Sequence, residues 1–94
     1  MNTIVVTRHP GLLEVLRERG VVPQNCEDYY SHVTPELVRG KAVIGVLPLH
    51  LAAEADSVTE VALNLPPEAR GRELTADEVR KYMIGVHTYK VTRI

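Results

Sequence analysis

The chain has 94 residues, of which 45% are hydrophobic and 24% charged, and this size and composition predict one soluble globular domain spanning residues 1–94. Its 11 Lys and Arg residues against 12 Asp and Glu residues give a formal net charge of -1, which excludes a wide basic surface for a long nucleic acid and favours a small anionic ligand. The single cysteine, Cys26, excludes an internal disulfide and is interpreted as a loop thiol without function, and the lack of a leader-like or long apolar segment predicts a cytoplasmic protein without membrane contact.

The first predicted elements are a buried strand and an amphipathic helix. Residues 3–7 (TIVVT) form a short apolar run rich in β-branched side chains, which is typical of a strand buried on both faces in a parallel sheet. Pro10 suits the first position of a helix whose apolar residues recur at helical spacing until Gly20. Residues 27–33 (EDYYSHV) then predict a second strand.

The second half of the chain alternates in the same way. Thr34 begins a short helix that Gly40 closes, and residues 42–47 (AVIGVL) are the clearest buried strand. The remaining predicted elements are, in order, a helix at 49–55, a strand at 58–65, a helix from the capping box at Thr75 and Glu78 to about Met83, and an edge strand at 87–94. This alternation predicts an α/β domain with right-handed crossovers and a mostly parallel, Rossmann-like sheet of about five strands flanked by helices.

Polar residues gather where the predicted strands end. Arg8 and His9 follow the first strand, Ser31 and His32 end the second, and His50 lies in the first turn of the helix after the third. Open α/β sheets bind ligands at the carboxyl ends of their strands, so these residues predict a site at that edge. Each histidine also has a structural alternative, because it could cap a helix, lie in a solvated loop or pack on a helix surface.

Arg8 indicates an anionic ligand. A guanidinium beside the start of a helix is repelled by the positive end of the helix dipole unless an anion lies between them. The alternative is a surface ion pair with a carboxylate such as Glu36. The connector at 66–74 (PPEARGREL) is longer than a simple turn, and its Arg70 and Arg72 could close over the same anion or remain solvated.

The histidines carry only a weak signal for a metal site. They come from separate segments, form neither an HxH nor an HExxH pair, and share their predicted edge with an arginine, which disfavours a divalent cation. The dinucleotide fingerprint, the phosphate-binding loop and the nucleophile elbow are also missing from the sequence. We therefore expect neither a metal ion nor a cofactor.

A resemblance to a known family is carried by three segments, TRHPG at 7–11, VIGVLPLHLAA at 43–53 and PPEARGREL at 66–74. In content and order they resemble a family of small Csx-type CRISPR-associated proteins of type III systems. That resemblance implies a stand-alone ring nuclease with a Rossmann-like, CARF-related fold. It implies a homodimer that binds cyclic oligoadenylate, with cyclic tetra-adenylate as the expected ring, and cleaves it to switch off type III signalling. It places candidate site residues at Thr7, Arg8, His9, His50, Arg70 and Glu73.

The physical chemistry of the residues agrees with such a ligand. A ring of phosphates suits a two-fold dimer, because each protomer presents the same few cations to it. Cleavage needs no metal, since the ribose 2′-hydroxyl attacks the neighbouring phosphate when it is held in line. Arg8 would bind phosphate oxygens, His50 would transfer a proton, and His9 would position the phosphate or share the proton transfer. A non-catalytic module that sequesters the ring and a small metal-dependent phosphohydrolase remain alternatives.

Overall fold

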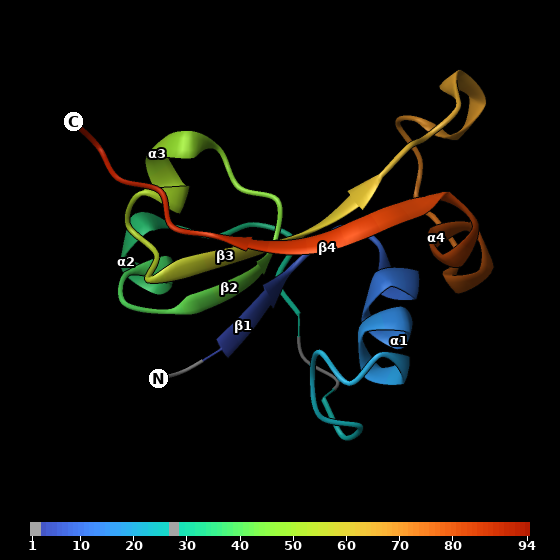
Figure 1. The fold of residues 1–94 in the computed structure, drawn as a ribbon, viewed down its shortest axis with the longest axis horizontal. Helices are drawn as coiled ribbons and strands as arrows, with labels where there is room; N and C mark the ends of the chain where they lie inside the picture. The colour runs from blue at the N-terminus through green and yellow to red at the C-terminus, as the bar shows by residue number, and fades with distance from the viewer. Residues whose placement is uncertain (1–2, 27–28) are drawn as a thin grey trace.

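The computed structural model describes residues 3–26 and 29–94, which form a mixed α/β domain with helices on both faces of one sheet (Figure 1). The strands are β1 (Thr3–Val6), β2 (Ala42–Gly45), β3 (Ser57–Leu63) and β4 (Met83–Tyr89), in that order across the sheet. β1, β2 and β3 are parallel, and β4 is antiparallel to β3. The α/β class is confirmed, whereas the described residues form four strands instead of about five.

The predicted strand at 27–33 is reduced to one bridge. Residues 27 and 28 lie outside the described residues, and of the rest only Tyr30 pairs, in parallel with Val6. Tyr30 N–H donates to the carbonyl of Val5 at 2.8 Å, and Thr7 N–H donates to the carbonyl of Tyr30 at 2.8 Å. The prediction fails because the side chains around Tyr30 are mostly exposed, so burial does not hold more of this segment against the sheet.

Four short helices and one 3₁₀ turn connect the strands: α1 (Pro10–Glu18), α2 (Pro35–Val38), α3 (Leu49–Ala52), η1 (Pro67–Ala69) and α4 (Ala76–Tyr82). The capping box that opens α4 is confirmed. The sequence predicts the last strand at 87–94, but β4 spans Met83–Tyr89. Tyr89 already pairs with Val58, and Ser57 is the one residue of β3 beyond that pair, so β3 offers almost no partner for residues after Tyr89. None of the described helices is long and apolar enough to cross a membrane.

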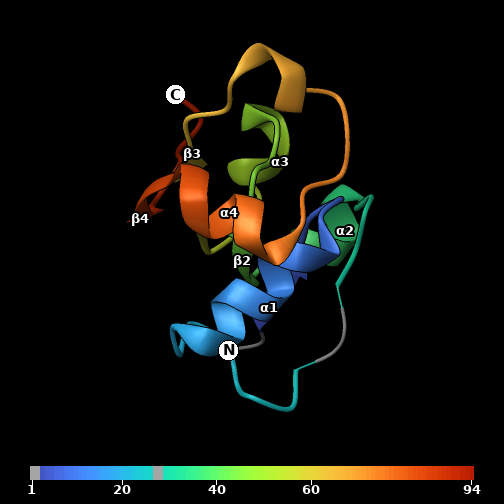
Figure 2. The ribbon, with the colours of Figure 1, turned by 90° about the vertical axis from the view of Figure 1, so that its right-hand side faces the viewer.

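Two buried clusters lie on opposite faces of the sheet, because successive strand residues point in opposite directions. One cluster joins β1, β2 and β3 to α1 and α4, which lie side by side in Figure 2, and contains Val5, Leu12, Leu13, Val15, Leu16, Ile44, Val61 and Val79. The other lies beneath α2 and α3 and contains Val6, Val38, Val43, Ala52, Ala55 and Val58. Each fully buried valine or leucine contributes about 1.5–3 kcal/mol to stability.

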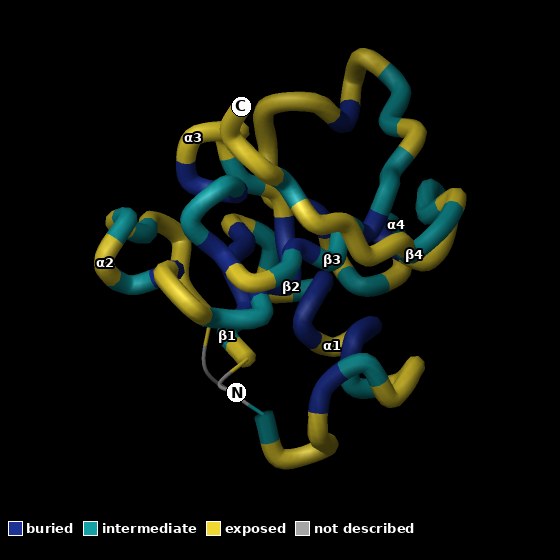
Figure 3. Tube along the Cα trace, turned by 60° about the vertical axis from the view of Figure 1, so that its left-hand side comes forward, coloured by how far each residue is buried: buried dark blue, intermediate teal, exposed yellow. Residues whose placement is uncertain are grey.

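Exposure differs along the two central strands and their connections (Figure 3). Residues 43–45 of β2 are buried, whereas only Val58 and Val61 are buried in β3. Beyond the carboxyl edge Thr7 is still buried, and Arg8 is exposed. Buried side chains therefore hold the end of β1 in place, while Arg8 and the half-buried His9 stay accessible to a ligand.

Two glycines permit close packing beside that edge. A Cβ at Gly11 in the first turn of α1 would overlap the backbone nitrogen of Ala76, so the start of α4 rests directly on the start of α1. Gly45 at the end of β2 has φ +145, and a Cβ there would overlap the carbonyl oxygen of Val6. Both glycines thus bring separate segments together around the end of β1.

Candidate functional site

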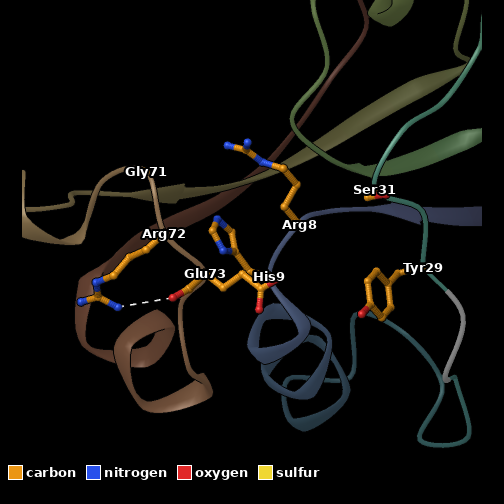
Figure 4. Close-up of a pocket in the computed structure, with 7 residues that line it drawn as sticks. All are labelled: Arg8, His9, Tyr29, Ser31, Gly71, Arg72 and Glu73. Carbon is orange, nitrogen blue, oxygen red and sulfur yellow. Dashed lines mark hydrogen bonds between the residues drawn. The ribbon is translucent and has the colours of Figure 1, made fainter.

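A cleft of about 440 Å³ lies at the carboxyl end of β1 (Figure 4). Its described lining residues are Arg8, His9, Tyr29, Ser31, Gly71, Arg72 and Glu73. An adjoining cavity of about 620 Å³ shares Arg8, His9 and Ser31 with this cleft and continues toward the ends of β2 and β3. The structure therefore brings the residues after β1 together with those around position 31 and with the 66–74 connector.

The position of the cleft follows from the path of the chain. Tyr30 pairs along one edge of β1, and β2 pairs along the other. The connection from β1 to Tyr30 passes through α1 on one face of the sheet, and the connection from Tyr30 to β2 passes through α2 on the other face. The two connections therefore separate at the end of β1. Such a divergence leaves a crevice outside the carboxyl ends of the strands, which is the usual ligand position in open α/β sheets.

His9 is held by two segments of the chain. Its backbone N–H donates to Thr7 Oγ1 at 3.0 Å, and its ring Nδ1 accepts the backbone N–H of Leu74 at 3.1 Å. Although His9 occupies the N-cap position of α1, its side chain makes no capping bond. Because Nδ1 is an acceptor, the neutral ring carries its proton on Nε2.

The charge state of His9 follows from its surroundings. Burial lowers the pKa of His9, the positive charge of Arg8 lowers it further, and Glu73 opposes both effects. Protonation would also place a hydrogen on Nδ1, opposite the N–H of Leu74, and break that bond. His9 is therefore a neutral ring with one N–H donor available to a ligand, and it is poorly suited to pass a proton back and forth.

Arg8 is exposed at the cleft and forms no hydrogen bond or ion pair with the residues that the structure describes. The alternative pairing with Glu36 is not present. The first turn of α1, which starts two residues later, contains no acidic side chain to offset the positive end of the helix. An anion bound between Arg8 and this helix start would be stabilised by both.

The two connector arginines have different surroundings. Arg72 lines the cleft, but its guanidinium donates to both carboxylate oxygens of Glu78, at 2.9 and 2.5 Å. It also donates to the backbone carbonyl of Glu73 at 3.3 Å, the bond drawn as a dashed line in Figure 4. The Arg72 guanidinium is the main cause that lowers the pKa of Glu78 to about 2. Among the described residues, Arg70 donates only to the carbonyl of Leu65, at 3.4 Å, and it is absent from the described lining of the cleft. Arg72 thus braces the connector and is not simply solvated.

The remaining predicted residues are partly separated from the cleft. Thr7 is buried and His32 is exposed, and both line the adjoining cavity. His50 in α3 lines a different groove, together with the chain end at Val91–Ile94, because the segment after β2 carries α3 away from the end of β1. In one chain, then, the structure does not bring His50 to Arg8 and His9.

Sequence reasoning missed Tyr29 and Gly71 as lining residues. Tyr29 lies inside the predicted strand at 27–33, and its aromatic side chain two residues before Ser31 was the available signal. Within the described part of the chain, no group of three or more His, Cys, Asp or Glu residues is placed to hold a metal ion.

Comparison of the sequence with models of known protein families identified a matching family. The model of the family described as "Putative CRISPR-associated protein (Cas_VVA1548)" matches residues 4–92. No curated protein and no solved structure matched the chain. The family match includes the end of β1, the start of α1 and the whole 66–74 connector, and it covers nearly the entire sequence. The chain therefore belongs to this family of CRISPR-associated proteins.

Proposed function

We propose that this CRISPR-associated chain is a metal-independent ring nuclease, which binds cyclic oligoadenylate and cleaves it to switch off type III signalling. The observation that carries the proposal is Arg8, whose guanidinium lies in a cleft beside the start of α1 without a charged partner among the described residues. A phosphodiester supplies the negative charge that this arrangement lacks. The resemblance to Csx-type proteins supports an adenylate ring as the source of the phosphate.

The proposed reaction uses a nucleophile within the substrate. The ribose 2′-oxygen forms a bond to the neighbouring phosphorus, the bond from phosphorus to the 5′-oxygen breaks, and the product ends in a 2′,3′-cyclic phosphate. Arg8 and the Nε2–H of His9 donate to the phosphate oxygens as negative charge builds on them. Glu73, a carboxylate that lines the cleft, accepts the proton of the 2′-hydroxyl, and water returns a proton to the departing 5′-oxygen.

We propose a homodimer as the binding species. A ring of four phosphates can have two-fold symmetry, and two protomers would present Arg8 and His9 to it twice. Sedimentation of the chain with and without cyclic tetra-adenylate measures this directly. A monomer in both conditions would contradict a site that two chains share.

The non-catalytic alternative is favoured by one specific observation. The bond from Leu74 occupies Nδ1 of His9, so the cleft does not offer a histidine that can act freely as a base. A chain that binds the ring without cutting it would still need Arg8 and the Nε2–H of His9. Binding and cleavage must therefore be measured separately.

Cleavage of cyclic tetra-adenylate with and without EDTA tests the proposal. We expect cutting to survive EDTA and to yield 2′,3′-cyclic phosphate ends. Arg8→Gln should weaken binding about 10- to 100-fold, because charge-assisted hydrogen bonds contribute about 1.5–3 kcal/mol. Arg39→Gln is the matched control, since that exposed arginine pairs with Glu54 away from the cleft. Cutting that EDTA abolishes and zinc restores would indicate the phosphohydrolase, and binding without cutting would indicate the sequestering module.

A further inference from the structure

Tyr29 and Tyr30 are adjacent and equally exposed, yet they line different cavities. Their exposed fractions are 39% and 40%. Tyr29 lines the cleft with Arg8 and His9, whereas Tyr30 lines a separate cavity with residues of β1 and with Val22 and Pro23. The two hydrogen bonds that Tyr30 makes, with Val5 of β1 and with Thr7 directly after it, hold this segment extended. An extended chain points successive side chains in opposite directions. The fold thus presents the Tyr29 ring to the cleft.

We propose that Tyr29 forms a nucleobase subsite, in which an adenine of the ligand stacks on the tyrosine ring while its phosphate contacts Arg8. This inference rests on the proposed binding of an adenylate. Tyr29 is the only aromatic residue among the described residues that line the cleft, apart from the His9 imidazole. Stacking of a base on an aromatic side chain contributes about 1–3 kcal/mol.

The arrangement of the cleft favours a nucleotide over a simple anion. In Figure 4 the Tyr29 ring lies on one side of Arg8 and His9, and Arg72 and Glu73 lie on the other. An occupant that extends from Arg8 to Tyr29 meets a cation at one end and a flat apolar surface at the other. Ser31 lies on the same wall and offers a hydroxyl that both donates and accepts hydrogen bonds. An inorganic phosphate would leave the Tyr29 end of the cleft unused.

Calorimetric titration with cyclic tetra-adenylate tests the subsite. Tyr29→Leu removes the aromatic ring and should weaken binding about 5- to 150-fold. Tyr29→Phe keeps the ring and should bind within about twofold of the wild type, because only the phenolic hydroxyl is lost. Tyr30→Leu is the matched control, equal in exposure and adjacent in sequence, and should also stay within about twofold.

The outcomes separate the subsite from the proposed function. If Arg8→Gln weakens binding while Tyr29→Leu titrates like the wild type, the subsite is overturned and the proposed function stands. If the wild-type chain does not bind cyclic tetra-adenylate, both are overturned. Should Tyr29→Leu fail to fold, the ring-proton resonances of wild-type Tyr29, assigned with Tyr29→Phe, decide the question. They must shift on ligand addition more than those of Tyr30, and equal shifts would overturn the subsite.

Discussion

The ring Nδ1 of His9 accepts the backbone N–H of Leu74 at 3.1 Å, which joins two residues that lie 65 positions apart in the sequence. This bond ties the end of β1 to the last residue of the 66–74 connector. It also selects the tautomer of His9 and leaves the Nε2–H as the donor for a ligand. One contact therefore sets both the shape of the cleft and the chemistry that His9 can perform.

Substitutions at His9 should separate these two roles. His9→Ala leaves the N–H of Leu74 unpaired in a residue that is only 2% exposed, and should lower the free energy of unfolding by about 1–3 kcal/mol. His9→Asn carries an amide oxygen near the position of Nδ1 and should retain most of that stability. Both variants lose the Nε2–H and should bind cyclic tetra-adenylate more weakly. Urea unfolding and calorimetry measure the two effects, and an alanine variant as stable as the wild type would contradict the role of the bond.

Stability should fall when the pH drops below neutral. The pKa of His9 is lowered in the folded chain from its ordinary value of 6.5. Between the folded pKa and 6.5 the unfolded chain binds more protons, so the free energy of unfolding rises with pH in this window. The contribution of His9 to stability is complete above pH 6.5 and is lost as the pH falls toward its folded pKa. Below that pKa the free energy of unfolding no longer changes through His9. Urea midpoints across this range measure the slope, and His9→Asn should remove this component of it.

Gly11→Ala should be destabilising although it lies in a helix. Alanine normally stabilises a helix interior by about 1 kcal/mol relative to glycine. Here the added Cβ would overlap the backbone of Ala76 and push the start of α4 away from α1. We expect the free energy of unfolding to fall by about 1–3 kcal/mol, as in other overpacked positions, with weaker ligand binding. A variant with a raised melting temperature would show that the two helix starts do not touch as described.

Removing the charge of Glu78 should loosen the connector. Glu78 accepts two hydrogen bonds from Arg72 and one from the backbone N–H of Thr75, at 3.1 Å. Its pKa is lowered to about 2 from 4.5, so its stabilising contribution is present above pH 4.5 and is lost as the pH falls through about 2. Glu78→Gln should speed hydrogen exchange at the amides of residues 71–74. Glu68→Gln, in the same connector, is the control, and equal exchange in both variants would contradict the bracing.

In the proposed mechanism, His50 takes no part in cleavage at the cleft of its own chain. His50 lines the groove beside Val91–Ile94 and is absent from the described lining of the cleft. His50→Ala should therefore cut cyclic tetra-adenylate within about twofold of the wild-type rate, as expected for an exposed residue outside the site. A loss of about tenfold or more would indicate a proton-transfer role and would place His50 of a second copy at the substrate.

Local sequence signals were sufficient for several parts of the fold. Proline at the first helical position and buried leucines at helical spacing located α1, and the capping box of Thr75 and Glu78 located the start of α4. The apolar run at β2 and the polar residues after β1 likewise needed no knowledge of distant contacts. These signals depend on neighbouring residues, and for that reason they can be read from the sequence alone.

Long-range contacts decided the rest. The pairing partners of Tyr30 and Tyr89 determined where the strands stop, and local β propensity could not supply those partners. Only the packed structure brought Leu74 to the ring of His9 and Tyr29 to the cleft, and only there does α3 carry His50 to another groove. The sequence by itself determined which residues could bind an anion, whereas the tertiary structure decided which of them meet, because their proximity depends on contacts between segments far apart in the chain.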